Sequence, residues 1–419
     1  QRTVGPGPSG GKPLGPARLP LVPWERSIEE VHVAASGVID RAGLDELIAA
    51  LRNDGYTTIG PTIREGAIVY DEISGTSDLP VGWTDQQAPG GYRLEHLADG
   101  RMFGYVVGPQ SWKRFLYPQR NVIWSGMVTE DGWETVAQPE PPRYAFIGVR
   151  GCELAAIAVQ DRVFLAAGDR AADPSYAARR EGVFIVAVNC ADPGANCFCT
   201  SMGTGPVAGP GHDLALTETV TDDGVVLLAE SGSDRGEALL ASLATMRPAQ
   251  IADHERAAET MAAARATVPH SMDTTDIHDL LLGNLEHPHW ETVAARCLGC
   301  ANCTMVCPTC FCGTVTDELD LDGGTARRVR SWDSCFTLEF SYIHGGSIRQ
   351  GGSARYRQWL THKLAAWFAQ CGTSGCVGCG RCITWCPVGI DLTVEVAAIR
   401  AKDLRPAAPL AADGTEVNL

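Results

Sequence analysis

The sequence lacks the features that would point to a membrane, a secreted or a nucleic-acid-binding protein. It has no run of about 18 apolar residues, which is what a helix needs to cross a bilayer, and it shows no signal peptide. It has no excess of basic residues either, because 34 Lys and Arg stand against 50 Asp and Glu, for a formal net charge of −16. This charge argues against nucleic acid and anionic membranes as partners. We therefore expect a cytoplasmic protein.

The common motifs of an active site are also missing. No G-x-G-x-x-G fingerprint lies between an expected strand and an expected helix, so no Rossmann dinucleotide site is predicted. The sequence contains no specific pattern for a catalytic Ser–His arrangement or a carboxylate pair. Whether the chain is an enzyme stays open at this stage, and we expect no active site of its own.

Cysteine is what the sequence has in abundance, with sixteen in 419 residues. Without an export signal, the disulfide framework of a secreted protein is not expected. Metal ligation is the best remaining explanation. The hydrophobic share of 45% and the charged share of 20% are those of a globular protein, and the length suits two or three domains.

Composition and pattern divide the chain into four parts. Residues 1–23 are rich in Gly and Pro and predict an extended arm, and residues 401–419 form a C-terminal tail. Residues 24–285 predict an α/β domain whose mixed sheet contains a βαβ unit. Residues 286–400 hold twelve of the sixteen cysteines and predict a mostly α-helical, ferredoxin-type dicluster domain.

The βαβ unit is the most readable part of the α/β domain. Tyr144–Val149 and 182–188 are continuous apolar runs, typical of buried parallel strands, and Glu153–Phe164 between them has helical spacing. The other expected elements are a helix around Leu44 to Leu51, strands at 67–70 and 103–107, a hairpin of 214–220 with 225–229, and a helix at about 251–267. An apolar stripe between the cysteine motifs predicts core-packing helices and comprises Tyr356, Trp359, Leu360, Leu364, Trp367 and Phe368.

Two segments fit the pattern C-x2-C-x2-C-x3-C-P, one beginning at Cys297 and the other at Cys376. In this pattern the first three thiolates turn toward one [4Fe-4S] cluster, and the fourth cysteine ligates the other cluster. We therefore predict two [4Fe-4S] clusters. The first would be held by Cys297, Cys300, Cys303 and Cys386, and the second by Cys376, Cys379, Cys382 and Cys307.

Two other interpretations of these cysteines are weaker. A pair of zinc sites would also accept four thiolates each, but this spacing is unusual for zinc. Cys303, Cys307 and Cys310 match the C-x3-C-x2-C spacing of radical S-adenosylmethionine enzymes. That match is nested within a longer motif that recurs 79 positions later.

Four further cysteines suggest a third cluster. Cys152 and Cys190 directly follow the two strands of the βαβ unit, whose carboxyl ends share one edge of the sheet. Cys197 and Cys199 follow in the next loop. Four thiolates are what a [4Fe-4S] cluster needs, although buried, redox-inert thiols are an equally open interpretation. A second quartet, Cys310, Cys312, Cys335 and Cys371, shows no strand geometry that would bring it together, and packing thiols are the favoured interpretation.

Several stretches resemble the beta subunit of soluble group 3b [NiFe] hydrogenases, also called sulfhydrogenases, a family related to the electron-transfer subunit of anaerobic sulfite reductases. The resemblance covers about residues 40 to 400, and its main stretches begin at Ile147, Asn196, Cys307, Ser331 and Cys376. Glu153 stands where Asp is expected after the cysteine, which keeps the charge. Cys371 is an extra cysteine for the family.

The resemblance implies an electron relay and not a site of chemistry. Its partners would be the hydrogenase large and small subunits and a further protein that binds FAD and NAD(P). Electrons would pass between the [NiFe] centre and the flavin through [4Fe-4S] clusters of this chain, in either direction. The alternative is the same role in an anaerobic sulfite reductase, whose partner would carry siroheme.

Overall fold

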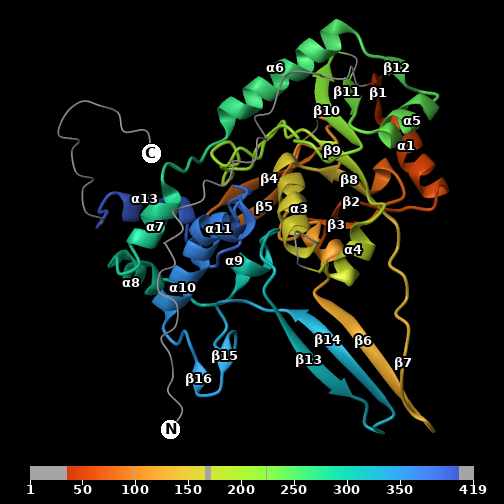
Figure 1. The fold of residues 1–419 in the computed structure, drawn as a ribbon. Helices are drawn as coiled ribbons and strands as arrows, with labels where there is room; N and C mark the ends of the chain where they lie inside the picture. The colour runs from red at the N-terminus through yellow and green to blue at the C-terminus, as the bar shows by residue number, and fades with distance from the viewer. Residues whose placement is uncertain (1–34, 98, 166–170, 223, 405–419) are drawn as a thin grey trace, which may run out of the picture. The chain divides into compact units, whose positions relative to one another are not determined.

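An eight-stranded mixed sheet is the framework of the computed structural model, which describes residues 35–97, 99–165, 171–222 and 224–404. Strands β2, β8, β9 and β10 run parallel to one another at its centre, and the outer pairs are antiparallel (Figure 1). The spatial order is β12 (Arg247–Pro248), β1 (Ser36–Ile39), β11 (Gly224–Ser231), β10 (Leu214–Thr221), β9 (Phe184–Val188), β8 (Tyr144–Val149), β2 (Thr57–Arg64) and β3 (Ala67–Glu72). The arm expected at 1–23 and the tail from 405 onward lie outside the described residues.

The predicted βαβ unit is confirmed. β8 and β9 pair in parallel, and α3 (Gly151–Phe164) connects them together with α4 (Pro174–Arg180). Every residue of β9 is buried, which explains why its sequence is apolar without alternation. The expected helix near Leu44 is α1 (Arg41–Asn53), which begins where Asp40 accepts a hydrogen bond from the Gly43 N–H. The hairpin β10–β11 and α6 (Ile251–Thr267) also lie where they were predicted.

The strand predicted at 103–107 is wrong, because this segment is a buried loop. Its backbone groups bond to side chains and not to a neighbouring strand. The Glu218 carboxylate accepts a hydrogen bond from the Phe103 N–H, and the Asp85 carboxylate accepts one from the Val106 N–H. The Arg150 guanidinium donates to the Phe103 carbonyl. Buried backbone groups need such partners, and three charged side chains supply them here.

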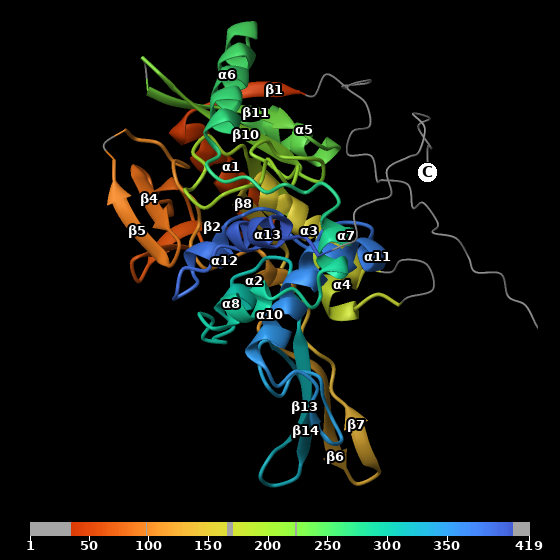
Figure 2. The ribbon, with the colours of Figure 1, turned by 90° about the vertical axis from the view of Figure 1, so that its left-hand side faces the viewer.

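A second sheet joins segments that are far apart in the sequence. It contains β13 (Gly313–Leu319), β14 (Thr325–Trp332), β6 (Arg120–Thr129) and β7 (Gly132–Thr135), with β14 antiparallel to β6. Figures 1 and 2 show the four strands side by side. The sheet crosses the domain boundary expected at residue 285, and all described residues belong to one compact unit. A separate hairpin is formed by β4 (Trp83–Ala88) and β5 (Gly91–His96).

The C-terminal part contains more helix than strand, which agrees only in part with the mostly α-helical expectation, because it also supplies β13 to β16. The apolar stripe is buried in it, except that Phe368 is 36% exposed. Its helices are α7 (Ile277–Gly283), α8 (His289–Ala294), α9 (Asn302–Met305), α10 (Gly352–Thr361), the π-helical η2 (His362–Ala366), α11 (Trp367–Cys371), α12 (Arg381–Thr384) and α13 (Leu392–Arg400). The remaining short elements are η1 (Thr76–Asp78), α2 (Lys113–Leu116), α5 (Asp234–Ser242), β15 (Tyr342–Ile343) and β16 (Gly346–Ser347). Among the described helices, none is long and apolar enough to cross a membrane.

Candidate functional site

The two cysteine motifs form loops of the same shape. In each, a glycine two residues after the first cysteine has a positive φ, 64° at Gly299 and 66° at Gly378. This left-handed turn lets its N–H donate to the sulfur of the first cysteine, over 3.4 Å to Cys297 Sγ and 3.5 Å to Cys376 Sγ. Glycine adopts such a conformation without a steric cost. The loops therefore hold their thiols by the same backbone hydrogen bond.

The first predicted ligand set comes together around one space. Cys297, Cys300, Cys303 and Cys386 line a volume of about 420 Å³, its open mouth included. The other walls are largely apolar, with Tyr356 and Trp359 from α10 among them. Burial raises the pKa of the Cys303 thiol well above its ordinary value, and the nearby Cys297, Cys300 and Cys386 add to this shift. We call these four cysteines the first site.

The second predicted set also comes together. Cys307, Cys376, Cys379 and Cys382 line a space of about 290 Å³. The Lys363 ammonium donates to Cys307 Sγ over 3.1 Å. Burial lowers the pKa of Lys363, but the charges of Cys307 and its neighbours raise it well above the usual value. The second site therefore has a cationic side chain hydrogen-bonded to one of its thiols.

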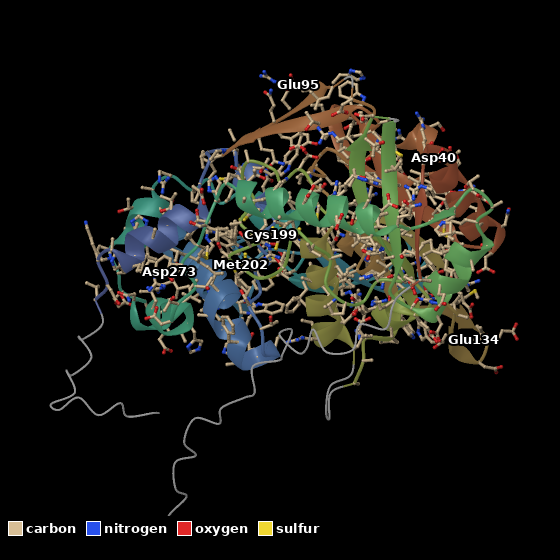
Figure 3. All side chains as sticks on the ribbon, turned by 90° about the horizontal axis from the view of Figure 1, so that it is seen from above. Asp40, Glu95, Glu134, Cys199, Met202 and Asp273 are labelled. Carbon is tan, nitrogen blue, oxygen red and sulfur yellow. The ribbon has the colours of Figure 1, made fainter. Side chains whose placement is uncertain are left out.

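The third predicted set converges at the edge of the large sheet. Cys152, Cys190, Cys197 and Cys199 line a space of about 440 Å³; Figure 3 labels Cys199. The four come from the start of α3, the end of β9 and the loop that follows. A Cβ on Gly205, which lines the same space, would lie 3.1 Å from Cys199 Sγ. The structure thus brings together the four cysteines of the third site.

Two buried arginines lie against the third site, and no pattern in the sequence had indicated them. Arg150 and Arg381, 5% and 4% exposed, line its space. Arg381 forms an ion pair with Glu153 at 2.5 Å. Burial raises the pKa of Cys152 and Cys197 well above the ordinary thiol value, so these thiols ionise only with compensating positive charge.

The donor sets fit [4Fe-4S] clusters better than single metal ions. Each site presents four thiols around a shared space, which is the ligand set that such a cluster requires. In the part of the chain that the structure describes, no three or more His, Cys, Asp or Glu residues are arranged to hold one metal ion.

Three members of the second quartet also come together, which the sequence did not predict. Cys310, Cys312 and Cys335 line one cavity of about 1180 Å³, its open mouth included. Cys371 lies at the end of α11, where its carbonyl accepts a hydrogen bond from Arg162. The register of β13 on β14, which pairs Gly313 with Trp332, explains how the residues just outside both strands meet.

Comparison with known proteins agrees with this arrangement. Residues 296–390 match the family model of the 4Fe-4S dicluster domain. The sulfhydrogenase 2 subunit beta of Pyrococcus furiosus is 32% identical over 251 residues, which cover 59% of this chain and 72% of the relative. No solved structure gives a significant match. With two motif loops that face each other and a relative of this identity and coverage, the chain belongs to the family of sulfhydrogenase beta subunits.

Proposed function

We propose that this chain is the electron-transfer subunit of a multi-subunit, NAD(P)-linked [NiFe] hydrogenase. It would relay electrons between the hydrogenase small and large subunits and a further protein that binds FAD and NAD(P). Membership in the sulfhydrogenase beta family and the dicluster domain support this role. The proposed ligands are the four cysteines of each of the three sites.

The observation that carries the proposal is the continuity of the three sites. Cys382 lines the spaces of both the first and the second site, and Cys379 lines those of both the second and the third. The sites thus form an unbroken row from the helical part to the edge of the large sheet. A [4Fe-4S] cluster bound at each site would take up and release single electrons. A row of this kind suits a relay.

The surrounding side chains would adapt each site to negative charge. At the second site Lys363 donates to Cys307 Sγ, and at the third Arg150 and Arg381 lie against the thiols. Hydrogen bonds to sulfur and nearby charge are the main means by which a protein sets a cluster's potential. The first site differs, since its other walls are largely apolar and Cys300 is exposed to solvent.

The first test is the metal content of the complex purified without oxygen. Nickel in the co-purifying subunits supports the proposal, and siroheme in their place would move the chain to an anaerobic sulfite reductase. In this chain separated from its partners without oxygen, about twelve irons are expected if all three sites hold clusters, and about eight would remove the third site.

A pair of variants tests the third site directly. Cys190→Ser should lower the iron content by about four atoms per chain, whereas Cys371→Ser should leave it unchanged. Electron paramagnetic resonance of the reduced complex should then show one signal fewer in the Cys190→Ser variant alone. An unchanged iron count in that variant would exclude Cys190 as a ligand.

A further inference from the structure

The first site differs from the other two in the hydrogen-bond donors that its walls contain. Lys363 lines the second site, and Arg150 and Arg381 line the third, whereas no charged side chain lines the first among the described residues. Apart from the thiols, the polar side-chain groups on its walls are the Tyr356 hydroxyl and the Trp359 indole N–H, both from α10. A side-chain hydrogen bond at this site can therefore come only from these two residues.

Tyr356 is held in the wall of the first site by other aromatic rings. It is 2% exposed. Its ring lies 6.2 Å from that of Phe336 and 5.4 Å from that of Trp359, measured between centroids. Phe336 and Trp359 line the same space. The three rings thus form one packed wall, in which the Tyr356 hydroxyl has no access to solvent.

The Tyr356 hydroxyl is buried and has no hydrogen-bond partner in the part of the chain that the structure describes. A buried polar group without a partner is costly and uncommon in folded proteins. Glu395 acts on Tyr356 through its charge, but its two carboxylate oxygens are paired with His289 and Arg296 at 2.6 and 2.5 Å. The hydroxyl therefore remains a donor whose acceptor belongs to the site that it lines.

The surroundings of Tyr356 keep its proton in place. Burial raises the pKa of Tyr356 well above its ordinary value, and the charge of Glu395 adds to this shift. The charges of Cys303, Cys382 and Cys297 follow as smaller causes in the same direction. A protonated phenol beside these sulfurs donates a hydrogen bond.

We propose that the Tyr356 hydroxyl donates a hydrogen bond to a sulfur of the [4Fe-4S] cluster held by the first site, and that this bond raises the reduction potential of that cluster. This role rests on the proposed function, because it requires a cluster at the first site. An added electron makes the sulfurs more negative, and a hydrogen bond to a more negative acceptor is stronger. The hydroxyl keeps its proton throughout and stabilises the reduced state more than the oxidised state.

Trp359 fits this role less well than Tyr356. Its indole N–H is also buried without a partner among the described residues. However, Trp359 lines both the first site and the large cavity that Cys310 and Cys312 line, so its N–H has two spaces open to it. Tyr356 lines the first site and not that cavity. The donor is therefore assigned to Tyr356.

The test is a redox titration of the full chain, separated from its partners without oxygen and with its clusters in place. Electron paramagnetic resonance follows each reduced cluster, and Cys300→Ala identifies the signal of the first site by its loss. In Tyr356→Phe, the ratio of reduced to oxidised first-site cluster at a fixed potential should fall roughly fivefold, as expected for one hydrogen bond. This fall equals a downward shift of about 40 mV, because a tenfold change is about 59 mV for one electron.

Tyr105→Phe is the matched control. Tyr105 is 1% exposed, and its hydroxyl is also buried without a partner among the described residues. It lines none of the spaces of the three sites. Its loss of a buried hydroxyl should leave the potential of the first site unchanged.

A second readout separates a hydrogen bond from a change of packing. After exchange into deuterium oxide, electron–nuclear double resonance of the first-site signal should lose one deuteron coupling in Tyr356→Phe and none in Tyr105→Phe. Unchanged couplings in Tyr356→Phe, or a change in the reduced-to-oxidised ratio of less than about twofold, would overturn the donor. A shift in Trp359→Phe but not in Tyr356→Phe would move the hydrogen bond to the indole and overturn it as well.

The iron content shows which of the two proposals fails. If Cys300→Ala loses about four irons while Tyr356→Phe changes neither the potential nor the couplings, the first site stands and only the role of Tyr356 is wrong. If Cys300→Ala loses no iron, the first site holds no cluster, and the relay fails there together with the role of Tyr356.

Discussion

The buried ion pair between Glu153 and Arg381 offers a sharp test of how the sheet and the cluster-binding part hold together. Glu153 lies in the first turn of α3, and Arg381 begins α12 of the second motif. Their side chains meet at 2.5 Å and are 1% and 4% exposed. The same carboxylate accepts from the Tyr70 hydroxyl and the Trp112 indole N–H. Glu153→Gln would keep the size of the side chain and remove its charge.

The expected cost follows from what the substitution leaves behind. Arg381 would stay charged, because a guanidinium is not deprotonated in proteins, and it would be 4% exposed without its carboxylate partner. A buried charge that loses its partner costs about 3–5 kcal/mol. Replacing both partners with apolar groups is often close to neutral. The double variant Glu153→Gln/Arg381→Met should therefore recover much of the stability that Glu153→Gln loses.

Anaerobic urea unfolding, followed by far-ultraviolet circular dichroism, provides the measurement. The midpoint should fall by about 1 M or more in Glu153→Gln, given a slope of up to about 3 kcal/mol per M, and should rise again in the double variant. Glu46→Gln is the control, since Glu46 is only partly buried and its carboxylate accepts a neutral backbone hydrogen bond from the Ala244 N–H. The single variant Arg381→Met completes the cycle. If the losses of Glu153→Gln and Arg381→Met simply add in the double variant, the pair is not coupled and the reasoning fails.

Three further predictions concern other parts of the molecule. Cys300→Ala should lose about four irons per chain and stop electron flow through the complex, while circular dichroism still reports the folded sheet; surviving flow would refute the cross-ligated relay. An alanine in a left-handed conformation costs ~1 kcal/mol, and Gly299→Ala should lower the stability by only this amount because the space around it is open. Gly378→Ala should lower it by well over this amount, because its Cβ would lie 2.6 Å from the Phe198 carbonyl oxygen. The urea midpoints of the two variants measure the difference. Burial lowers the pKa of Lys113 to about 8, so the folded state loses this proton at a lower pH than the unfolded state does. The free energy of unfolding should therefore increase as the pH is raised from about 8 to 10. Lys113→Met should remove this increase in unfolding curves measured at a series of pH values.

Local elements and local motifs were predictable because their signals lie within a few residues. The βαβ unit, α1 and α6 were found from apolar runs and helical spacing, and the motif loops from cysteine spacing. The segment at 103–107 was mistaken for a strand because its apolar residues reflect burial, which a loop shares when charged side chains satisfy its backbone. A single sequence does not distinguish these two causes of burial.

The sequence by itself determined which cysteines belong to the two motifs, and the rule that parallel strands end at one edge was enough to suggest the third set. Only the tertiary structure decided that neighbouring sites share Cys382 and Cys379, that Arg150 and Arg381 lie against the third, and that Cys310, Cys312 and Cys335 line one cavity. These arrangements depend on contacts between segments far apart in the chain. The pairing of β14 with β6 and the ion pair between α3 and α12 are examples, and no local pattern of residues encodes them.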